Sequence, residues 1–450
     1  MAGSYVSTTN PCRMCRPLGA CLAFRGVENA IVLLHGSQGC STYMRRYISS
    51  HFHEPVDIAS SSLSEKNAVY GGEASLKQGI RNVIAKYAPA VLGVATTCLT
   101  ETIGDDVPRI IASLLRKEPA VGDTAIIPVS TPSYSGSHVD GFNEACVAIV
   151  EKLAAPSEKT GAINLFPGFV SPADTRHLQE IMADFETPAV LLPDLSQTLD
   201  GGIDGSYSRL PPGGVSREAV AGMAGSAFSI EFNMTGPSGQ SAARLLDDRY
   251  DVYGERLPLP IGIRNCDRFF QTLGDMALRP VPGKHRQERA RLLDAMVDAH
   301  KYLFGRKAAI FGDADFALAL TSFLADAGIV PVLVASGGGG DEFAALVRAA
   351  AAPAGTPPVI LTQTDFDEIR EQALQTGAEL LVGSSKGNHI ARELDIPLLR
   401  LGFPVHDRIG AQRILHIGYR GSMNLLDMLT NIVIAREQER LGGGYGYSYM

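Results

Sequence analysis

The chain has 450 residues, of which 45% are hydrophobic and 20% are charged. That length and composition provide for a large buried core and exceed a single compact domain, so we expect about three domains at roughly 150 residues each. The formal net charge of −8 gives no general attraction to nucleic acid or to an anionic membrane, which argues against both as partners.

The sequence shows no signal peptide and no membrane span. No charged segment near Met1 precedes an apolar stretch, and no run reaches the roughly 18 apolar residues of a membrane helix. We therefore expect a cytoplasmic protein. Seven cysteines, an odd number, argue for reduced thiols rather than a disulfide framework.

Along the chain, a short apolar run, a turn rich in Gly, Ser or Asp, and an amphipathic stretch of helical length recur in that order. This order is typical of parallel α/β units. The clearest unit has a strand at 307–311, a helix through about Ala327 and a second strand at 329–335. Further strands are expected within 90–98, 161–170 and, twice, 379–402. The predicted fold class is α/β, with three Rossmann-like lobes whose parallel sheets are flanked by helices.

Shifts in composition predict the boundaries between the lobes. The polar segment AAPSEKTG near residue 155 interrupts helical periodicity, and RPVPGKHRQER near residue 285 precedes a long helix. The predicted division is an N-terminal α/β lobe at 1–155, a middle α/β lobe at 156–285, and a C-terminal α/β lobe with its tail at 286–450.

Three glycine-rich segments are predicted to lie outside the regular elements. Residues 200–216 read as a surface loop, and GGGG at 337–340 reads as a flexible turn. That turn lacks the GxGxxG spacing of a dinucleotide site, and no phosphate-binding GxxxxGK motif occurs, so a nucleotide-binding role has little support. The tail GGGYGYSYM is either disordered or an arm held against a partner.

Three cysteines stand where a strand-like run gives way to a turn or a helix start: Cys15 in CRPLGA, Cys40 in HGSQGC and Cys98 in TTCLTETIGDD. Cys15 and Cys40 are 25 residues apart, and Cys98 lies 58 residues further on, so a shared metal site would be built by the tertiary fold. Three thiolates fall short of the four that usually close an iron–sulfur site, so a complete cluster needs another ligand or another chain. A partner subunit is the first expectation.

The other cysteines have simpler interpretations. We predict that Cys21, Cys146 and Cys266 are small buried side chains within the core. Cys12 and Cys15 form an isolated CRMC, which is a possible redox or zinc motif, but the absence of a second such pair disfavours it.

Several long blocks of the sequence resemble the β-type subunit of nitrogenase component 1, and the similarity runs over nearly the whole chain. The blocks are NPCRMCRPLGA at 10–20, LLHGSQGCSTYMRRY at 33–47, HFHEPVDIASSSLSE at 51–65, TTCLTETIGDD at 96–106, TPSYSGSHVDGF at 131–142 and RLGFPVHDR at 400–408.

The resemblance implies an electron-relay role. Cys15, Cys40 and Cys98 match the β-type cysteines that, with three from an α-type subunit, hold an eight-iron (8Fe-7S) P-cluster at the subunit interface. Ser133 matches a serine that can ligate the oxidised cluster, although a serine after a proline is also a common turn or cap residue. An ATP-hydrolysing iron–sulfur protein would dock on an α2β2 assembly and deliver electrons, and substrate would be reduced at a cofactor in the α-type chain.

The residues around these cysteines have both site and structural interpretations. Gly19, Gly36 and Gly39 would let the backbone approach inorganic sulfide, or would serve ordinary turns. His35 is expected to be a hydrogen-bonded core histidine rather than a ligand. Tyr43 is a better candidate than Arg46 for a neighbour of the cluster. No catalytic role is assigned to three acids that are expected to be helix-capping or helix-dipole residues: Glu101, Asp105 and Asp106.

Two departures from the family leave the substrate open. Cys15 lies close to Met1, so the long N-terminal arm of the molybdenum-type β-subunit is missing, and Cys12 and Cys266 stand in unusual contexts. Dinitrogen and the organic thioethers cleaved by methylthio-alkane reductases are therefore competing substrates. A non-catalytic scaffold for cofactor assembly is an alternative function, but its β-like chain usually has fewer cysteines. A tetrapyrrole reductase, with a smaller cluster, fits less well.

Overall fold

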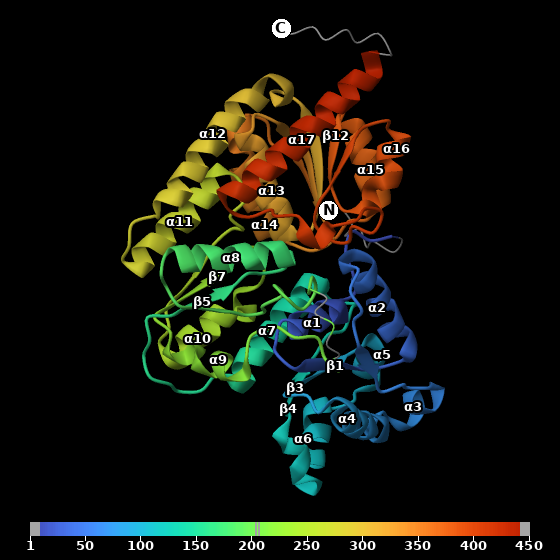
Figure 1. Ribbon diagram of the computed structural model, residues 1–450. Coiled ribbons are helices and arrows are strands. Elements are labelled where there is room, and N and C mark those ends of the chain that lie inside the picture. Colours follow the sequence, from blue (N-terminus) through green and yellow to red (C-terminus); the bar gives the residue numbers. More distant parts are fainter. Residues whose placement is uncertain (1–9, 203–204, 206–207, 442–450) are drawn as a thin grey trace. The chain divides into compact units, whose positions relative to one another are not determined.

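A computed structural model describes residues 10–202, 205 and 208–441, and its helices flank three sheets (Figure 1). Every pairing between the named strands is parallel. The predicted α/β fold class with three parallel sheets is therefore confirmed. The tail at 442–450 and four residues of the loop predicted at 200–216 lie outside the described residues.

Contacts between residues divide the chain into two compact units. The unit that we call the N-terminal unit comprises Met14–Arg256 and Gly410–Ile414, and it contains two of the sheets. The C-terminal unit contains the third sheet and comprises, among the described residues, 10–13, Leu257–Ile409 and 415–441. The finer division into three lobes, with boundaries near 155 and 285, stays a prediction.

The first sheet of the N-terminal unit has the strand order β2-β1-β3-β4. Its strands are β1 (Ala30–His35), β2 (Ile58–Ser60), β3 (Val91–Thr96) and β4 (Ala125–Val129). Its helices are α1 (Arg16–Arg25), α2 (Gln38–Phe52), α3 (Glu65–Tyr70), α4 (Glu73–Tyr87), α5 (Cys98–Ile103), α6 (Val107–Lys117) and α7 (His138–Leu153), with a 3-10 turn at Pro119–Asp123. Every residue of β1 and β3 is buried, as expected for parallel strands covered on both faces.

Helix α6 illustrates how the local sequence builds this layer. Its buried residues Val107, Ile110, Ile111 and Leu114 recur at the helical spacing and join the hydrophobic core beneath the sheet. The side chain of Asp106 accepts a hydrogen bond from the backbone N–H of Arg109 at 3.0 Å, which caps the helix.

The second sheet of the N-terminal unit has the order β6-β5-β7-β8. Its strands are β5 (Ile163–Phe166), β6 (Ala189–Leu191), β7 (Phe228–Glu231) and β8 (Gly254–Arg256). The helices around it are α8 (Pro172–Asp184), α9 (Arg217–Gly222) and α10 (Ala242–Tyr250), with 3-10 turns at Met223–Gly225, Ser238–Gln240 and Ala411–Arg413. The strand predicted within 161–170 is β5.

The sheet of the C-terminal unit has the order β11-β10-β9-β12-β13. Its strands are β9 (Lys307–Gly312), β10 (Val330–Ser336), β11 (Val359–Thr362), β12 (Leu380–Gly383) and β13 (Leu398–Arg400). Its helices are α11 (Ile263–Ala277), α12 (Gly283–Leu303), α13 (Ala314–Asp326), α14 (Asp341–Ala351), α15 (Phe366–Gln375), α16 (Asn388–Glu393) and α17 (Gly418–Leu441), with 3-10 turns at Ala352–Ala354 and Ser385–Gly387. The strand–helix–strand unit predicted at 307–335 is confirmed as β9-α13-β10. Within the part of the chain described, no helix has the length and apolar composition needed to cross a membrane.

Candidate functional site

The three cysteines predicted to bind metal all lie in the N-terminal unit, each at the start of a helix. Cys15 is the N-cap residue of α1, Cys40 is the third residue of α2, and Cys98 is the first residue of α5. Helices α2 and α5 follow β1 and β3, which pair in register up to His35 and Thr96. Cys40 and Cys98 therefore both follow the carboxyl ends of neighbouring parallel strands, on the same side of the sheet.

Ser133 connects Cys98 to the beginning of α1. Its backbone N–H donates to Cys98 Sγ at 3.2 Å, and its Oγ accepts a hydrogen bond from the backbone N–H of Arg16 at 3.2 Å. Arg16 directly follows Cys15 in the chain. Ser133 thus links Cys98 to the residue after Cys15, and it lies in the loop between β4 and α7. Ser133 is not a helix cap, because Ser137 is the N-cap residue of α7.

Tyr43 lies one helical turn after Cys40 on α2, a helix that contacts α1. Its ring packs against Tyr47 with centroids 4.7 Å apart. Burial raises the pKa of the Tyr43 hydroxyl, with smaller contributions from its hydrogen bond to Tyr47 and from the charge of Cys15. The Oγ of Ser37 donates to Cys40 Sγ at 3.6 Å, so this sulfur also has a polar neighbour.

Burial separates these three cysteines from the remaining four. Cys98 is exposed, and Cys15 and Cys40 are partly exposed. The other four are buried, as predicted for three of them: Cys12, Cys21, Cys146 and Cys266. Burial raises the pKa of the thiols of Cys12 and Cys21 to about 12, and it also raises those of Cys146 and Cys266. All seven lie within the described residues, and none forms a disulfide.

Cys12 belongs to the C-terminal unit and does not act with Cys15 as a local motif. Its backbone N–H donates to the carbonyl of Thr364 at 3.0 Å, and its carbonyl accepts from Gly337 at 3.1 Å. A thiol with a pKa near 12 stays protonated at neutral pH. The redox or zinc interpretation of CRMC therefore has no support in the structure.

His35 is a buried core residue, as expected, and it orients the segment that leads to Cys40. Its Nδ1 lies 2.9 Å from Ser61 Oγ and its Nε2 lies 3.0 Å from Asp105 Oδ2. Burial lowers the pKa of His35, and the charge of Asp105 opposes this effect without cancelling it. Both ring nitrogens are engaged by protein groups, so His35 serves the loop rather than a metal.

The three acids near Cys98 have structural roles, although only Asp106 is a helix cap. Asp105 accepts hydrogen bonds from His35 and from the backbone N–H of Gly72, the latter at 3.1 and 3.0 Å from its two oxygens. Glu101 accepts from the hydroxyls of Ser130, at 2.6 Å, and Thr96. Asp105 and Glu101 therefore brace loops. Glu101 also lies in the first turn of α5, where an acidic side chain suits the helix dipole, as expected.

The three glycines near the cysteines differ in the space around them. A Cβ on Gly19 would stand 1.7 Å from the carbonyl oxygen of His138, and one on Gly36 would stand 2.3 Å from Thr97 Oγ1. These two glycines are required by close packing inside the unit. A Cβ on Gly39 would meet Ser37 Oγ at 3.7 Å as its nearest neighbour among the described residues, so the backbone beside Cys40 remains open to a bulky group.

Two features near the cysteines were not predicted from the sequence. Arg16 is almost fully buried and pairs with Glu144 of α7. Val69 and Tyr70, at the end of α3, expose 76% and 80% of their surface. The second feature has a sequence signal, since NAVYGG places two large apolar residues before a pair of glycines that ends a helix. The pairing of Arg16 with Glu144 has no such sequence signal, because the two residues are far apart in the chain.

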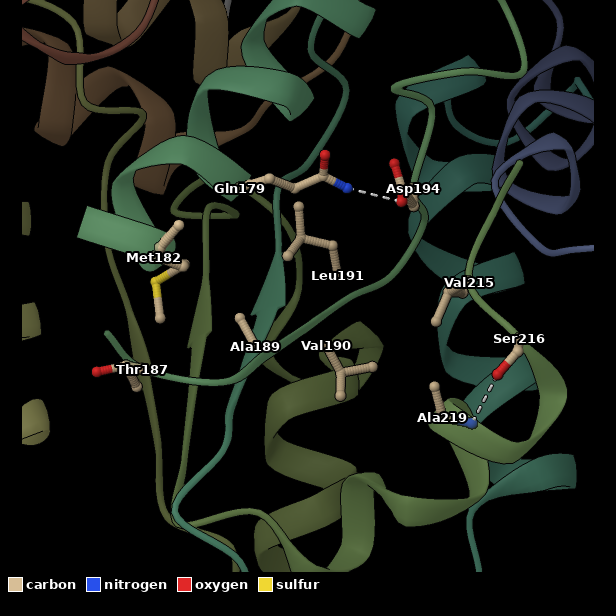
Figure 2. A pocket seen from close by; sticks show the side chains of 11 residues that line it. Gln179, Met182, Thr187, Ala189, Val190, Leu191, Asp194, Val215, Ser216 and Ala219 are labelled. Atoms are coloured by element: carbon tan, nitrogen blue, oxygen red, sulfur yellow. Dashed lines mark hydrogen bonds between the residues drawn. The ribbon is translucent and has the colours of Figure 1, made fainter. Parts of the chain in front are cut away.

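A pocket lies elsewhere in the N-terminal unit, between α8, β6 and the start of α9 (Figure 2). It has a volume of about 380 Å³. Its one ionisable lining residue, Asp194, accepts hydrogen bonds from Gln179 at 2.8 Å and from the backbone of Ser196 at 2.9 Å. None of the predicted site residues lines this pocket. Among the described residues, no three His, Cys, Asp or Glu side chains converge to hold a single metal ion.

Comparison with known proteins gives the family. A family model for "Nitrogenase component 1 type Oxidoreductase" matches residues 15–434. The chain belongs to this family. The molybdenum-iron protein beta chain of Clostridium pasteurianum nitrogenase is 35% identical over 427 residues, which cover 94% of this chain and 93% of that one. The vanadium-iron protein beta chain of Trichormus variabilis nitrogenase is 34% identical over 437 residues, which cover 95% of this chain and 94% of that one.

The solved structures agree with this membership. The structure "Nitrogenase Cp1 at pH 6.5" matches with a TM-score of 0.94 and 34% identity, covering 100% of this chain and 98% of that one. The chain is thus a β-type member of the nitrogenase component 1 family, and it is an oxidoreductase component of a multi-subunit complex. The resemblance inferred from the sequence blocks is confirmed.

Proposed function

We propose that the chain is the β-type subunit of a nitrogenase or nitrogenase-like reductase, and that Cys15, Cys40 and Cys98 supply half of the ligands of an 8Fe-7S P-cluster. An α-type subunit supplies the rest. The observation that carries this proposal is the difference in burial: these three cysteines alone among the seven reach the surface, and all three stand at helix starts of one unit.

The donor set fits an iron–sulfur cluster. Thiolates are the ligands that iron–sulfur clusters use, and N–H or O–H donors to the sulfurs stabilise their negative charge. Cys98 Sγ accepts from the backbone of Ser133, and Cys40 Sγ accepts from the hydroxyl of Ser37. Cys15 and Cys40 lie at the N-terminal ends of α1 and α2, where the helix dipole favours negative charge. Three thiolates leave the cluster incomplete, which requires a second chain.

We include Ser133 as a further ligand. A hydroxyl oxygen has two lone pairs, and the hydrogen bond from the Arg16 N–H uses one of them. The second lone pair is available to iron beside Cys98. When bound, the P-cluster would store electrons and pass them on. The residues of this chain would hold the thiolates and direct polar hydrogens at the sulfurs of Cys40 and Cys98.

The end of α3 is the proposed docking face for the ATP-hydrolysing iron–sulfur protein that delivers electrons. Helix α3 contacts α5, the helix that begins with Cys98. Val69 and Tyr70 are strongly exposed at its end, and neighbouring exposed apolar side chains commonly mark protein contacts. A reductase bound there would approach the cysteines from the side of α5.

The reduced substrate binds in the α-type subunit, so this chain does not select it. We propose dinitrogen or an organic thioether as the substrate. Two assays on the purified complex separate them: formation of ammonia from dinitrogen, and formation of a thiol from a thioether. Both assays must also contain ATP and the iron–sulfur protein that delivers electrons.

Iron analysis of the co-purified α-type and β-type chains tests the proposal. We expect an interface content of about eight irons for each pair of chains. A content of about four irons, together with no reduction of either substrate, would instead indicate a scaffold for cofactor assembly or a tetrapyrrole reductase.

A further inference from the structure

The loop that carries Ser133 is anchored at both ends. At its start, the backbone N–H of Thr131 donates to Thr96 Oγ1 at 2.8 Å, and its hydroxyl donates to the Thr96 carbonyl at 2.6 Å. At its end, Ser137 caps α7 through its pairing with Asp140. Between these anchors the loop contains Gly136 at φ +88°, a turn conformation that glycine adopts readily.

Arg16 contacts the middle of this loop. Its Nη1 donates both to the carbonyl oxygen of Ser135, at 3.0 Å, and to Ser135 Oγ, at 3.1 Å. Its backbone N–H donates to Ser133 Oγ at 3.2 Å. The one residue therefore contacts two positions of the loop, on either side of Tyr134.

The guanidinium of Arg16 is itself fixed. Its side chain is 11% exposed, and Nη2 forms an ion pair with Glu144 Oε1. That oxygen also accepts from Gln240 Nε2 at 2.7 Å. Because a buried charge is costly unless it is paired, and because the guanidinium presents its donors in a rigid plane, the position of this group is well determined.

We infer that Arg16 is a positioning residue: it holds the segment 133–135 so that the Ser133 N–H points at Cys98 Sγ and the Ser133 oxygen stays beside the cluster ligands. The effect of Arg16 on the cluster rests on the proposed function. The contacts of Arg16 with the loop do not depend on a cluster. Removing the guanidinium leaves the backbone hydrogen bond to Ser133 and releases Ser135.

Hydrogen exchange on the full-length chain without its cluster tests the arrangement of the loop. In Arg16→Gln, amide exchange in peptides covering 131–136 should be about tenfold faster than in the unsubstituted chain, since the loop loses a charge-assisted pair of hydrogen bonds. Arg16→Lys, which keeps the charge but not the planar donors, should give a smaller acceleration. Exchange that is unchanged in Arg16→Gln overturns the inference.

Arg176→Gln is the matched control. Arg176 makes the same kind of contacts in the same unit, to the carbonyl of Ser196 at 2.6 Å and to Asp200 Oδ2 at 2.7 Å, but it lies on α8. It should leave exchange at 131–136 unchanged. If Arg16→Gln does not fold, Glu144→Gln replaces it, because loss of the ion pair should loosen Arg16 and accelerate exchange in the same segment to a smaller extent.

The assembled complex gives the second readout. The midpoint potential of the interface cluster, measured by spectroscopic redox titration, should fall in Arg16→Gln. Once Ser135 is released, the Ser133 N–H is directed less well at Cys98 Sγ, and a weaker donor to the sulfur stabilises the reduced cluster less well. An unchanged potential overturns the positioning role. A complex that contains no interface cluster contradicts the proposed function, and the exchange measurement then still decides whether Arg16 holds the loop.

Discussion

Helix α1 holds two cysteines in opposite ways. Cys15 is at its N-cap and is partly exposed, whereas Cys21, near its middle, is 1% exposed and has a pKa raised to about 12 by burial. The same contrast separates Cys40 and Cys98, at helix starts, from Cys146 within α7 and Cys266 within α11. The start of a helix offers free N–H groups and reaches the edge of the sheet, while its interior packs into the core. Among the six cysteines at helix starts or within helices, position along the helix decides whether the thiol reaches the surface.

Removing a cysteine at a helix start should have the largest effect on iron content and activity. Cys98→Ala should lose interface iron and abolish substrate reduction, because the cluster lacks a ligand, while circular dichroism of the chain remains unchanged because an exposed side chain contributes little to packing. Iron analysis and the two substrate assays measure the outcome. Full iron content and activity in this variant would show that Cys98 is not a ligand.

A pair of glycine substitutions tests whether the backbone beside Cys40 has room for a side chain while the interior of α1 does not. Gly19→Ala should destabilise the chain by about 3 kcal/mol, because its Cβ would overlap the carbonyl of His138, which the packing of α1 on α7 holds in place. Gly39→Ala should change stability by less than about 0.5 kcal/mol, since the nearest described atom is 3.7 Å away. Urea unfolding compares the two. Equal effects would remove the distinction between edge and interior.

The buried His35 predicts a pH dependence of stability. Burial lowers its pKa in the folded chain below the unfolded value of 6.5, so the unfolded chain binds more protons between those two values. The free energy of unfolding should therefore decrease as the pH falls below about 6.5 and level off below the folded pKa.

His35→Gln is the variant for this test. It should lower stability at pH 7.5 by about 1–2 kcal/mol through loss of the bond to Asp105, and it should weaken the dependence on pH between 7.5 and 5.5. Urea unfolding at the two pH values measures both effects. A variant with the same dependence as the unsubstituted chain would assign the pH effect to other groups.

A cysteine within a helix should be nearly dispensable. Cys266→Ala removes a buried sulfur that contacts the carbonyl of Pro260 at 3.1 Å, and it should cost about 1 kcal/mol as a small core truncation. Iron content and substrate reduction should stay at the level of the unsubstituted complex. Loss of iron in this variant would contradict the division of the seven cysteines into two classes.

Local sequence patterns were enough to predict the three parallel sheets and the positions of Cys40 and Cys98 after β1 and β3. Cys15 was predicted to follow a strand-like run, but among the described residues no strand precedes α1. The patterns that succeeded are apolar runs of strand length, turn residues, and helical periodicity, as in β9-α13-β10. The family blocks also lie at strand ends or helix starts, so the order of residues along the chain was sufficient to select the candidate ligands.

The tertiary structure decided what depends on residues far apart in the chain. Gly19 is required by the carbonyl of His138, Asp105 holds Gly72 instead of capping a helix, and Arg16 pairs with Glu144. Each of these contacts joins segments that the fold, not the local pattern, brings together. Burial follows the same rule, because whether a thiol is shielded from water depends on the elements that cover it.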